Sequence, residues 1–224
     1  MTDHKTWLMA EYKSWGDALD NCSIRHFRSH SSVKRMLSDP PAHLFAPLIP
    51  NLDPRIWGYL DEIDAIGFPN RPEARSGLLL RHVFYALKVL AIDPPGIAEI
   101  GSAAGHFLAV LVALGWRGQY TSFDLPSVVH FQERFLDKAA SMTGLPMRRP
   151  VINGIPYPFA CSFYALGEFD DETKDRYIRD VIRKSEHGLV VWNPHSGASH
   201  EITFPCHVEC EQPLTGLGNK LLRW

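Results

Sequence analysis

The residues of this chain best placed to do chemistry surround a Gly-rich segment near its middle. The stretch Gly96–Leu111 begins as an apolar run of strand length, passes through a turn and continues as an apolar helix. Pro94 and Pro95 end the helical pattern that precedes it. A strand, a tight Gly-rich turn and a helix in this order open a nucleotide-binding α/β unit.

The composition of the turn decides which nucleotide it fits. A dinucleotide fingerprint has the form G-x-G-x-x-G, in which the second Gly admits the pyrophosphate and the third lets the helix pack. The corresponding residues here are Gly101, Ala103 and His106, so two of the three positions differ. The turn therefore argues against a nicotinamide oxidoreductase, which needs the pyrophosphate site.

An acidic residue and two glycines define a different pattern. Glu99 lies two positions before Gly101, and Gly105 lies four positions after it. This spacing resembles motif I of class I S-adenosylmethionine (SAM) methyltransferases, E/D-x-G-x-G-x-G, with Ala103 in place of the central Gly. The resemblance implies that the carboxylate fixes the methionine end of the cofactor and that the glycines admit a ligand without phosphate. The alternative is a strand, turn and helix that bind nothing.

A second carboxylate follows the next predicted strand, Gln119–Phe123. Asp124 lies 23 positions after Gly101, where nucleoside-binding α/β folds place a carboxylate that accepts both ribose hydroxyls. We therefore expect Asp124 to bind ribose. An Asp at this position can also do no more than cap the helix that begins at about Pro126.

We expect the general base where the fourth and fifth predicted strands end, after residues 159–166 and 189–192. These ends share one sheet edge with the Gly turn, so Tyr164, Glu168 and His195 can face a bound methyl group. His195 is the first candidate, because an imidazole titrates near neutrality. Glu168 would orient that ring, bind substrate hydroxyls or ligate a metal.

His106 is the reserve candidate for the base. It follows the Gly turn at the start of a helix, where the helix dipole disfavours the protonated ring. The alternative for His195, Glu168 and His106 alike is that they are polar lining of a pocket.

The helix expected over Gly77–Ile92 ends just before the motif-bearing strand. Its apolar positions face a core, and Arg81, His82 and Tyr85 lie on one or two of its turns. A helix in this place can hold polar groups over the pocket, so we expect these three residues to bind substrate. Arg81 and His82 can equally be solvated.

The remaining periodicity predicts a Rossmann-like α/β fold with a mostly parallel, seven-stranded sheet. A short third strand is expected at Arg148–Ile152, with no helix between it and the fourth strand. Strands Ile202–Val208 and Lys220–Trp224 would complete the sheet as an antiparallel hairpin. Further helices are expected at about Ala104–Leu114, at Pro126–Ser141 and between Asp170 and Gly188.

Residues 1–75 are expected to form an N-terminal helical and irregular extension, and residues 76–224 a SAM-binding domain. Prolines between positions 40 and 54 break the backbone of the extension into turns and short helices, so no long element is expected across them. A first amphipathic helix is indicated by the helical spacing of Trp7, Leu8, Tyr12, Trp15 and Leu19.

Bulk composition excludes several classes of protein. The 224 residues suit one or two domains, and 45% hydrophobic residues suffice for a buried core. Lys and Arg total 23 against 25 Asp and Glu, so the chain offers no general electrostatic handle for nucleic acid or an anionic membrane. The absence of a signal-peptide pattern and of an apolar run of about 18 residues predicts a cytoplasmic protein.

The four cysteines are few and mostly far apart, which fits free thiols in a reducing compartment. Cys206 and Cys210 flank His207 and Glu209, but alternation along a strand would place the two cysteines and those two residues on opposite faces. We therefore expect no metal site.

From about Gly67 to His195 the chain resembles the sugar O-methyltransferases of bacteria. Ala103 and Gly167 depart from the Gly and Ser of that family, and the chain is shorter, which bears on the acceptor more than on the fold. The segments that carry the resemblance are Ile66–Pro69, Leu80–Tyr85, Glu99–Gly101, Asp124–Val128, Tyr164–Glu168 and Asp175–Tyr177.

The resemblance implies transfer of a methyl group from SAM to a hydroxyl of a sugar or glycoside. It implies a cofactor site formed by Glu99, Gly101, Ala103, Gly105, Asp124, Leu125 and Tyr164. Two alternatives stay open: a non-sugar small molecule or peptide as acceptor, and a non-catalytic partner domain of the same fold. We expect a small-molecule or glycan substrate and no nucleic acid or membrane partner, and we leave a homo-oligomer open.

Overall fold

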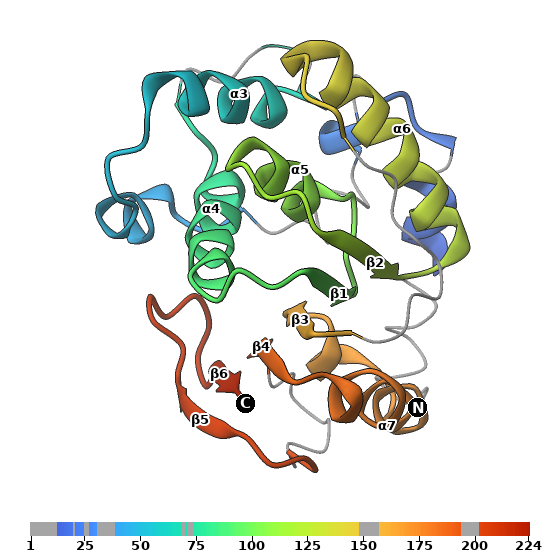
Figure 1. The fold of residues 1–224 in the computed structure, drawn as a ribbon. Coiled ribbons are helices and arrows are strands. Elements are labelled where there is room, and N and C mark those ends of the chain that lie inside the picture. The colour runs from blue at the N-terminus through green and yellow to red at the C-terminus, as the bar shows by residue number, and fades with distance from the viewer. Residues whose placement is uncertain are drawn as a thin grey trace.

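The computed structural model describes residues 13–19, 21–24, 27–30, 39–68, 70, 74–147, 157–193 and 202–224. Within these residues the chain has an α/β fold built on one six-stranded sheet of order β2-β1-β3-β4-β6-β5 (Figure 1). The strands are β1 (Gly96–Ile100), β2 (Gln119–Phe123), β3 (Phe159–Phe163), β4 (His187–Trp192), β5 (His207–Cys210) and β6 (Lys220–Arg223).

Helices precede, separate and follow the parallel strands. The α-helices are α3 (Pro54–Asp64), α4 (Gly77–Leu90), α5 (His106–Ala113), α6 (Pro126–Thr143) and α7 (Asp171–Asp180). Short 3-10 turns are η1 (Phe27–Ser29), η2 (Ala42–Leu44), η3 (Ala46–Leu48), η4 (Leu166–Glu168) and η5 (Ile182–Lys184).

The sheet is mixed, with a parallel half that carries the Gly-rich turn. Strands β2, β1, β3 and β4 pair in parallel, so their carboxyl ends share one edge. Strand β6 runs antiparallel to both β4 and β5. The described residues therefore contain six strands where seven were predicted, and the third predicted strand, 148–152, lies outside them. The predicted strand over 202–208 is wrong in position, because β5 begins at His207, after Pro205, which has no N–H to donate.

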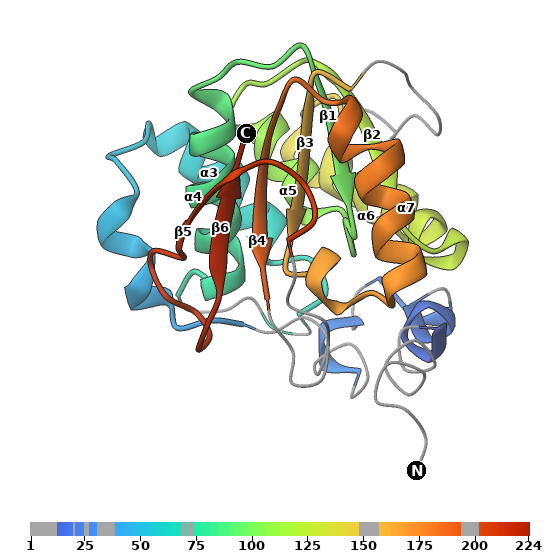
Figure 2. The same ribbon diagram turned by 90° about the horizontal axis from the view of Figure 1, so that it is seen from below.

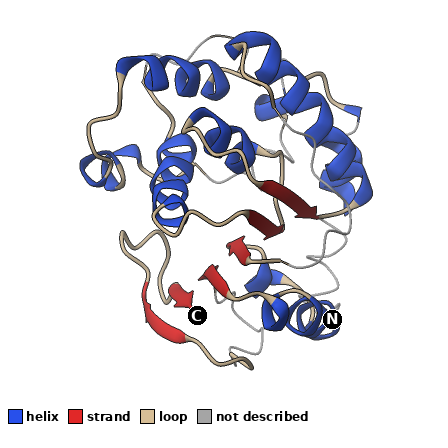
Figure 3. Cartoon of the chain, in the orientation of Figure 1, coloured by secondary structure: helices blue, strands red, loops and turns tan. Residues whose placement is uncertain are grey.

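Alternate strand residues face two separate cores. Ile97 of β1 packs into a large apolar cluster with α3, α4, α5 and α6, whereas its neighbour Ala98 packs into a smaller one with α7. Figures 1 and 3 show these four helices on one face of the sheet and α7 on the other. Strands buried on both faces explain why the parallel segments read as nearly continuous apolar runs.

Residues with positive φ end or delay several helices and strands relative to their predicted boundaries. The helix predicted from Ala104 starts at His106, because Gly105 has φ +85° and Ala103 φ +48°. Strand β3 ends at Phe163 instead of Leu166, because Tyr164 has φ +74°. These are conformations that a helix or strand cannot continue through.

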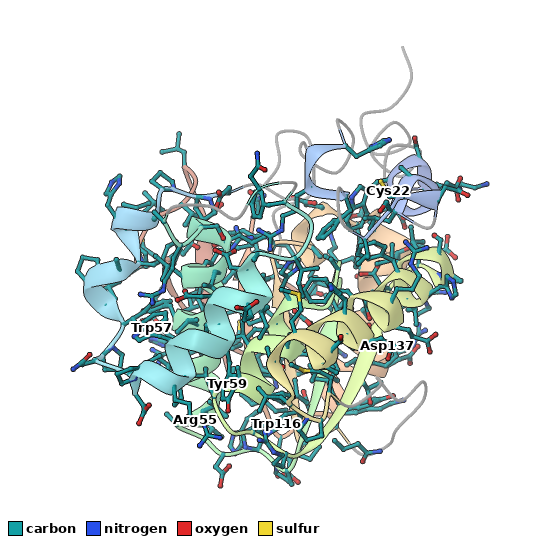
Figure 4. The ribbon with its side chains drawn as sticks, turned by 90° about the horizontal axis from the view of Figure 1, so that it is seen from above. Cys22, Arg55, Trp57, Tyr59, Trp116 and Asp137 are labelled. Atoms are coloured by element: carbon teal, nitrogen blue, oxygen red, sulfur yellow. The ribbon has the colours of Figure 1, made fainter. Side chains whose placement is uncertain are left out.

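Helix α3 was not predicted, although the sequence contains its start signal. The Asp53 carboxylate caps the helix by accepting from Arg55 N–H at 2.7 Å, and Pro54 stands at the first helical position. Leu60 and Ile63 are fully buried. Figure 4 shows Arg55 and Tyr59 along α3, and the Arg55 side chain donates to the Tyr59 hydroxyl at 2.8 Å.

The N-terminal extension packs against the same core as the sheet. Residues 13–19 are helical, as predicted for this part of the segment, and Trp15 and Leu19 are buried in the large cluster. In Figure 2 this helix lies on the side toward which the arrows of β1, β3 and β4 point. The boundary at residue 75 stays a prediction. No helix among the described residues is both long and apolar enough to cross a membrane.

We predict that Ile63→Ala lowers the free energy of unfolding by about 2–5 kcal/mol, because it leaves a cavity in the core shared by α3 and the sheet. Urea denaturation followed by fluorescence and circular dichroism should show one transition that moves as a whole. Leu48→Ala, at a side chain 49% exposed, is the control and should change stability little. Two separate transitions would show that the extension folds independently.

Candidate functional site

A cavity of about 180 Å³ lies at the carboxyl edge of the parallel strands. Residues that directly follow β1, β2, β3 and β4 line it, α4 forms one wall, and Trp15 of the N-terminal helix contributes to the lining. Edges of this kind, where parallel strands end and loops diverge, are where α/β folds bind ligands. The lining includes Arg81, His82, Glu99, Gly101, Ser102, Ala103, His106, Asp124, Leu125, Phe163, Tyr164, Glu168 and Asn193.

The turn after β1 is fixed by its backbone conformation and by close packing. Gly101, Ala103 and Gly105 all have positive φ. A side chain at Gly101 would overlap the Cβ of Ala165, so this position needs Gly for packing as well as for φ. Gly105 does not line the cavity: it is the left-handed N-cap of α5, in front of Gln132.

The carboxylate of Asp124 is tied to this turn. One oxygen accepts from Ala103 N–H and the other from Leu125 N–H, each at 2.8 Å. Burial raises the pKa of Asp124 to about 7, although the two backbone bonds act in the opposite direction. Two N–H groups use two of about four lone-pair sites of a carboxylate, so two further donors can still be accepted.

Glu99 lies deeper, inside β1 and next to β2. It is 3% exposed, and its carboxylate accepts a hydrogen bond from the Tyr120 hydroxyl. Burial raises the pKa of Glu99 to about 8, with a smaller contribution from nearby Asp124, while the Tyr120 bond lowers it. The carboxyl groups of Glu99 in β1 and Asp124 after β2 therefore both titrate near neutral pH.

A buried polar network that sequence reasoning missed holds the turn from behind. The hydroxyls of Ser102 and Ser122 hydrogen bond to each other, and the Gln132 amide of α6 joins both. Gln132 also donates to the Ala103 carbonyl at 2.7 Å. The turn, β2 and α6 are thereby connected, but the spacing of these residues in the sequence carries no signal for it.

Arg81, His82 and His106 line another part of the cavity, and Arg28 contacts His106 from outside the lining. Arg28 donates to His106 Nε2 at 2.6 Å and pairs with Asp64 at 3.3 Å. The ring of His106 stacks on that of His82 with centroids 6.0 Å apart. Burial, together with the positive charges of Arg28 and Arg81, holds the pKa of both histidines well below its usual range.

The contact with Arg28 decides what His106 can do. A guanidinium only donates, so Nε2 of His106 must be the unprotonated acceptor, and the proton of the neutral ring is on Nδ1. The lone pair that a general base would use is already occupied. His106 is therefore placed as a donor in the cavity wall.

Tyr164 is held by a buried carboxylate from the far end of the chain. The hydroxyls of Tyr164 and Tyr85 both donate to Oε1 of Glu211, which is 1% exposed. Thr215 and Asn219 complete the partners of this carboxylate. Burial raises the pKa of Tyr164 to about 12, so it is a neutral phenol. Tyr85 points into this network and does not line the cavity.

Glu168 stands at the cavity edge beyond β3. The Asn193 side chain, directly after β4, donates to Glu168 Oε1 at 3.1 Å, and both residues line the cavity. His195, the first candidate for the base, lies outside the described residues.

The structure thus brings together most of the residues singled out in the sequence. Two of them, Gly105 and Tyr85, lie behind the wall, and their roles, like those of the others, stay predictions. In the lining are Arg81, His82, Glu99, Gly101, Ala103, His106, Asp124, Leu125, Tyr164 and Glu168. The residues that were missed are Arg28, Ser102, Gln132, Asn193 and Glu211, all of which act through contacts distant in sequence.

No protein-family model and no curated protein matches this sequence. Solved structures give low-identity likenesses. The magnesium protoporphyrin IX methyltransferase of Synechocystis PCC 6803 with bound SAM is 12% identical over 65% of this chain and 80% of that chain, with a TM-score of 0.44. An O-methyltransferase of Bacillus cereus in complex with S-adenosylhomocysteine (SAH) is 10% identical over 81% and 95%, with a TM-score of 0.47.

An O-methyltransferase from neocarzinostatin biosynthesis in complex with SAH is 15% identical over 63% of this chain, with a TM-score of 0.42. This chain spans 56% of the length of that enzyme. All three identities are below 25% and all three TM-scores are below 0.5. Function therefore rests on the cavity of this chain and not on these likenesses.

We predict that the ligand-free protein loses stability as pH rises from about 5 to 8. Between the unfolded pKa values, near 4, and the folded values of about 7 for Asp124 and about 8 for Glu99, the native state holds protons that the unfolded chain has released. Each group then lowers the free energy of unfolding by at most about 1.4 kcal/mol per pH unit.

Glu99→Gln, which imitates the protonated acid, should make the pH dependence shallower in urea titrations at several pH values. Glu186→Gln, at an exposed residue after η5, is the control and should leave the slope unchanged. A Glu99→Gln slope equal to that of the wild type would show that Glu99 is ionised throughout this range.

Proposed function

We propose that this chain is a SAM-dependent O-methyltransferase that transfers the methyl group to a hydroxyl of a sugar or glycoside. One observation supports this best: four segments that carry the resemblance to sugar O-methyltransferases, far apart in the sequence, line a single cavity. They contribute Arg81 and His82, Glu99 and Gly101, Asp124 with Leu125, and Tyr164 with Glu168.

The acidic side of the cavity suits the nucleoside and the positive charges of SAM. Asp124 has two lone-pair sites left for the two ribose hydroxyls after binding Ala103 N–H and Leu125 N–H. Glu99 and Asp124 titrate near neutral pH, so a sulfonium or ammonium cation beside them favours their ionised forms. The turn from Gly101 to Ala103 presents backbone without bulky side chains between these two carboxylates.

SAM, when bound, supplies an electrophilic methyl carbon on a sulfonium, and in-line displacement by the acceptor oxygen leaves SAH. The acceptor hydroxyl must lose its proton to a base within hydrogen-bond reach. Because the Nε2 lone pair of His106 accepts a hydrogen bond from Arg28, His106 cannot take this proton and another side chain of the cavity must be the base. We place Glu168 in this role among the described residues, oriented by Asn193, and keep His195 as the second candidate.

We predict that Asp124→Asn weakens SAM binding about 10–100-fold, because a charged acceptor of the ribose hydroxyls is lost while one oxygen remains for the turn. Isothermal titration calorimetry with SAM and SAH measures the effect. Asp137→Asn, at an exposed position of α6 (Figure 4), is the control and should bind SAM like the wild type. Equal affinities for Asp124→Asn and the wild type would remove Asp124 from the ribose site, and a wild type that binds no SAM would contradict the proposed function.

We predict that Glu168→Gln lowers methyl transfer about 100–10,000-fold and leaves SAM affinity within a few-fold, because a base acts only on the acceptor proton. Transfer of a radiolabelled methyl group from SAM is measured with free sugars, nucleotide sugars and simple phenols as acceptors. His195→Ala is measured in parallel, and Glu172→Gln, exposed on α7, is the control.

Normal turnover of both Glu168→Gln and His195→Ala would exclude these residues as the base. Transfer to phenols alone would show that the fold and cofactor are correct and the sugar acceptor is wrong.

A further inference from the structure

Arg81 of α4 is a buried cation in the cavity wall. It is 8% exposed and lines the cavity, and its Nε has no hydrogen-bond partner. Its guanidinium lies over the ring of Tyr164, 4.6 Å from the ring centroid. This is a cation–π contact, and it leaves the N–H groups of the guanidinium as donors for a further partner.

Other buried basic side chains in the described part of the chain have a carboxylate partner. Arg28 pairs with Asp64 at 3.3 Å, and Lys174 pairs with Asp171 at 2.7 Å. Arg81 has no such partner among the described residues. A buried charge without a counter-ion is costly, and contact with an aromatic ring offsets only part of that cost.

The neighbours of Arg81 do not neutralise its charge: Glu99, Asp124 and Glu168 line the same cavity, but no ion pair joins any of them to Arg81 in the part of the chain that the structure describes. Arg28 contacts His106 from outside the lining, and the rings of His106 and His82 are held neutral by burial and by the arginines. His82 follows Arg81 directly, lines the same cavity, and its Nδ1 is a second buried polar atom with no partner. The carboxylate of Glu211 lies behind Tyr164 and is bound to two tyrosine hydroxyls, Thr215 and Asn219.

We propose that Arg81 is the counter-ion of an anionic group, a carboxylate or a phosphate, on a ligand of this cavity. This inference rests on the proposed function and adds that one ligand of the cavity carries a negatively charged group. Two sources have this chemistry: the methionine carboxylate of SAM, and an acid group on the acceptor, as in a uronic acid or a sugar phosphate. The planar edge of the guanidinium binds either group through two hydrogen bonds, which an ammonium cannot reproduce. Tyr164, fixed by Glu211, holds the guanidinium plane in place.

The test uses the full chain with two substitutions. Arg81→Met removes the positive charge, and Arg81→Lys keeps the charge but lacks the planar guanidinium that can form two parallel hydrogen bonds. Lys88→Met removes a positive charge from the exposed side of the same helix and is the matched control. Calorimetry measures SAM and decarboxylated SAM. Inorganic phosphate and D-glucuronate are measured with and without saturating SAH, and thermal melts establish that each variant is folded.

If SAM is the source, Arg81→Met weakens SAM about 10–100-fold and changes decarboxylated SAM less than about threefold. If the acceptor is the source, SAM affinity is unchanged and phosphate or D-glucuronate binding falls by a similar factor. In either case Arg81→Lys gives an intermediate affinity and Lys88→Met behaves like the wild type. If Arg81→Met does not fold, the affinities of Arg81→Lys for the same ligands are compared with those of the wild type instead.

Arg81 variants that bind all four ligands like the wild type would overturn the proposal and leave Arg81 as a packing partner of Tyr164. A wild type that binds no SAM contradicts the proposed function instead. Phosphate or D-glucuronate binding that depends on Arg81 would still support the counter-ion in that case.

Discussion

Between β1 and α5 the backbone reverses through three residues of positive φ, Gly101, Ala103 and Gly105, and the other features of the cavity are arranged around this path. The conformation of Ala103 is unfavourable for a residue with a Cβ, so contacts outside the turn must hold it. Asp124 accepts its N–H, and Gln132 donates to its carbonyl. Because Gly101 lies against Ala165, the same turn also sets the distance between the ends of β1 and β3. The position of the Asp124 carboxylate in the cavity lining is thus a consequence of its role in the turn.

Charge is distributed unevenly around the cavity. Glu99 and Asp124 stand at the ends of β1 and β2 and Glu168 stands beyond β3, while the cation Arg81 stands on α4 beside two neutral histidines. Low local dielectric strengthens the effect of each charge on its neighbours, which is why Asp124 raises the pKa of Glu99 and Arg28 lowers that of His106. A zwitterionic ligand with its cation toward the carboxyl groups and its anion toward α4 relieves both sides at once.

Local sequence patterns predicted the parallel strands and the Gly turn well, because each depends on neighbouring residues. The start of α3 was present as Asp53-Pro54, and the breaks at Pro47 and Pro50 obscured it. Contacts between distant residues were beyond reach: Arg28 meets His106 across 78 positions, and Tyr85 meets Glu211 across 126. These two contacts bear most on the predicted roles of His106 and Tyr85. The Nε2 lone pair of His106 is already bound to Arg28, and the Tyr85 hydroxyl is bound to Glu211 and not directed into the cavity.

Several unfavourable local features lie at this edge of the sheet, although Asp93 is also left-handed and Asn219 and Trp224 also bury a polar atom without a partner. Ala103 and Tyr164 are non-Gly residues with positive φ, and Arg81 and His82 each bury a polar atom without a partner, all in the cavity lining. Close by, the buried groups Gln132 and Glu211 are fully hydrogen bonded. A cavity with apolar side chains at positions 81 and 82 would avoid the cost of desolvation, so stability alone does not account for them. Strained backbone and an unpaired cation in a cavity lining are expected where a ligand completes the set of contacts, and the unpaired charge of Arg81 is positive.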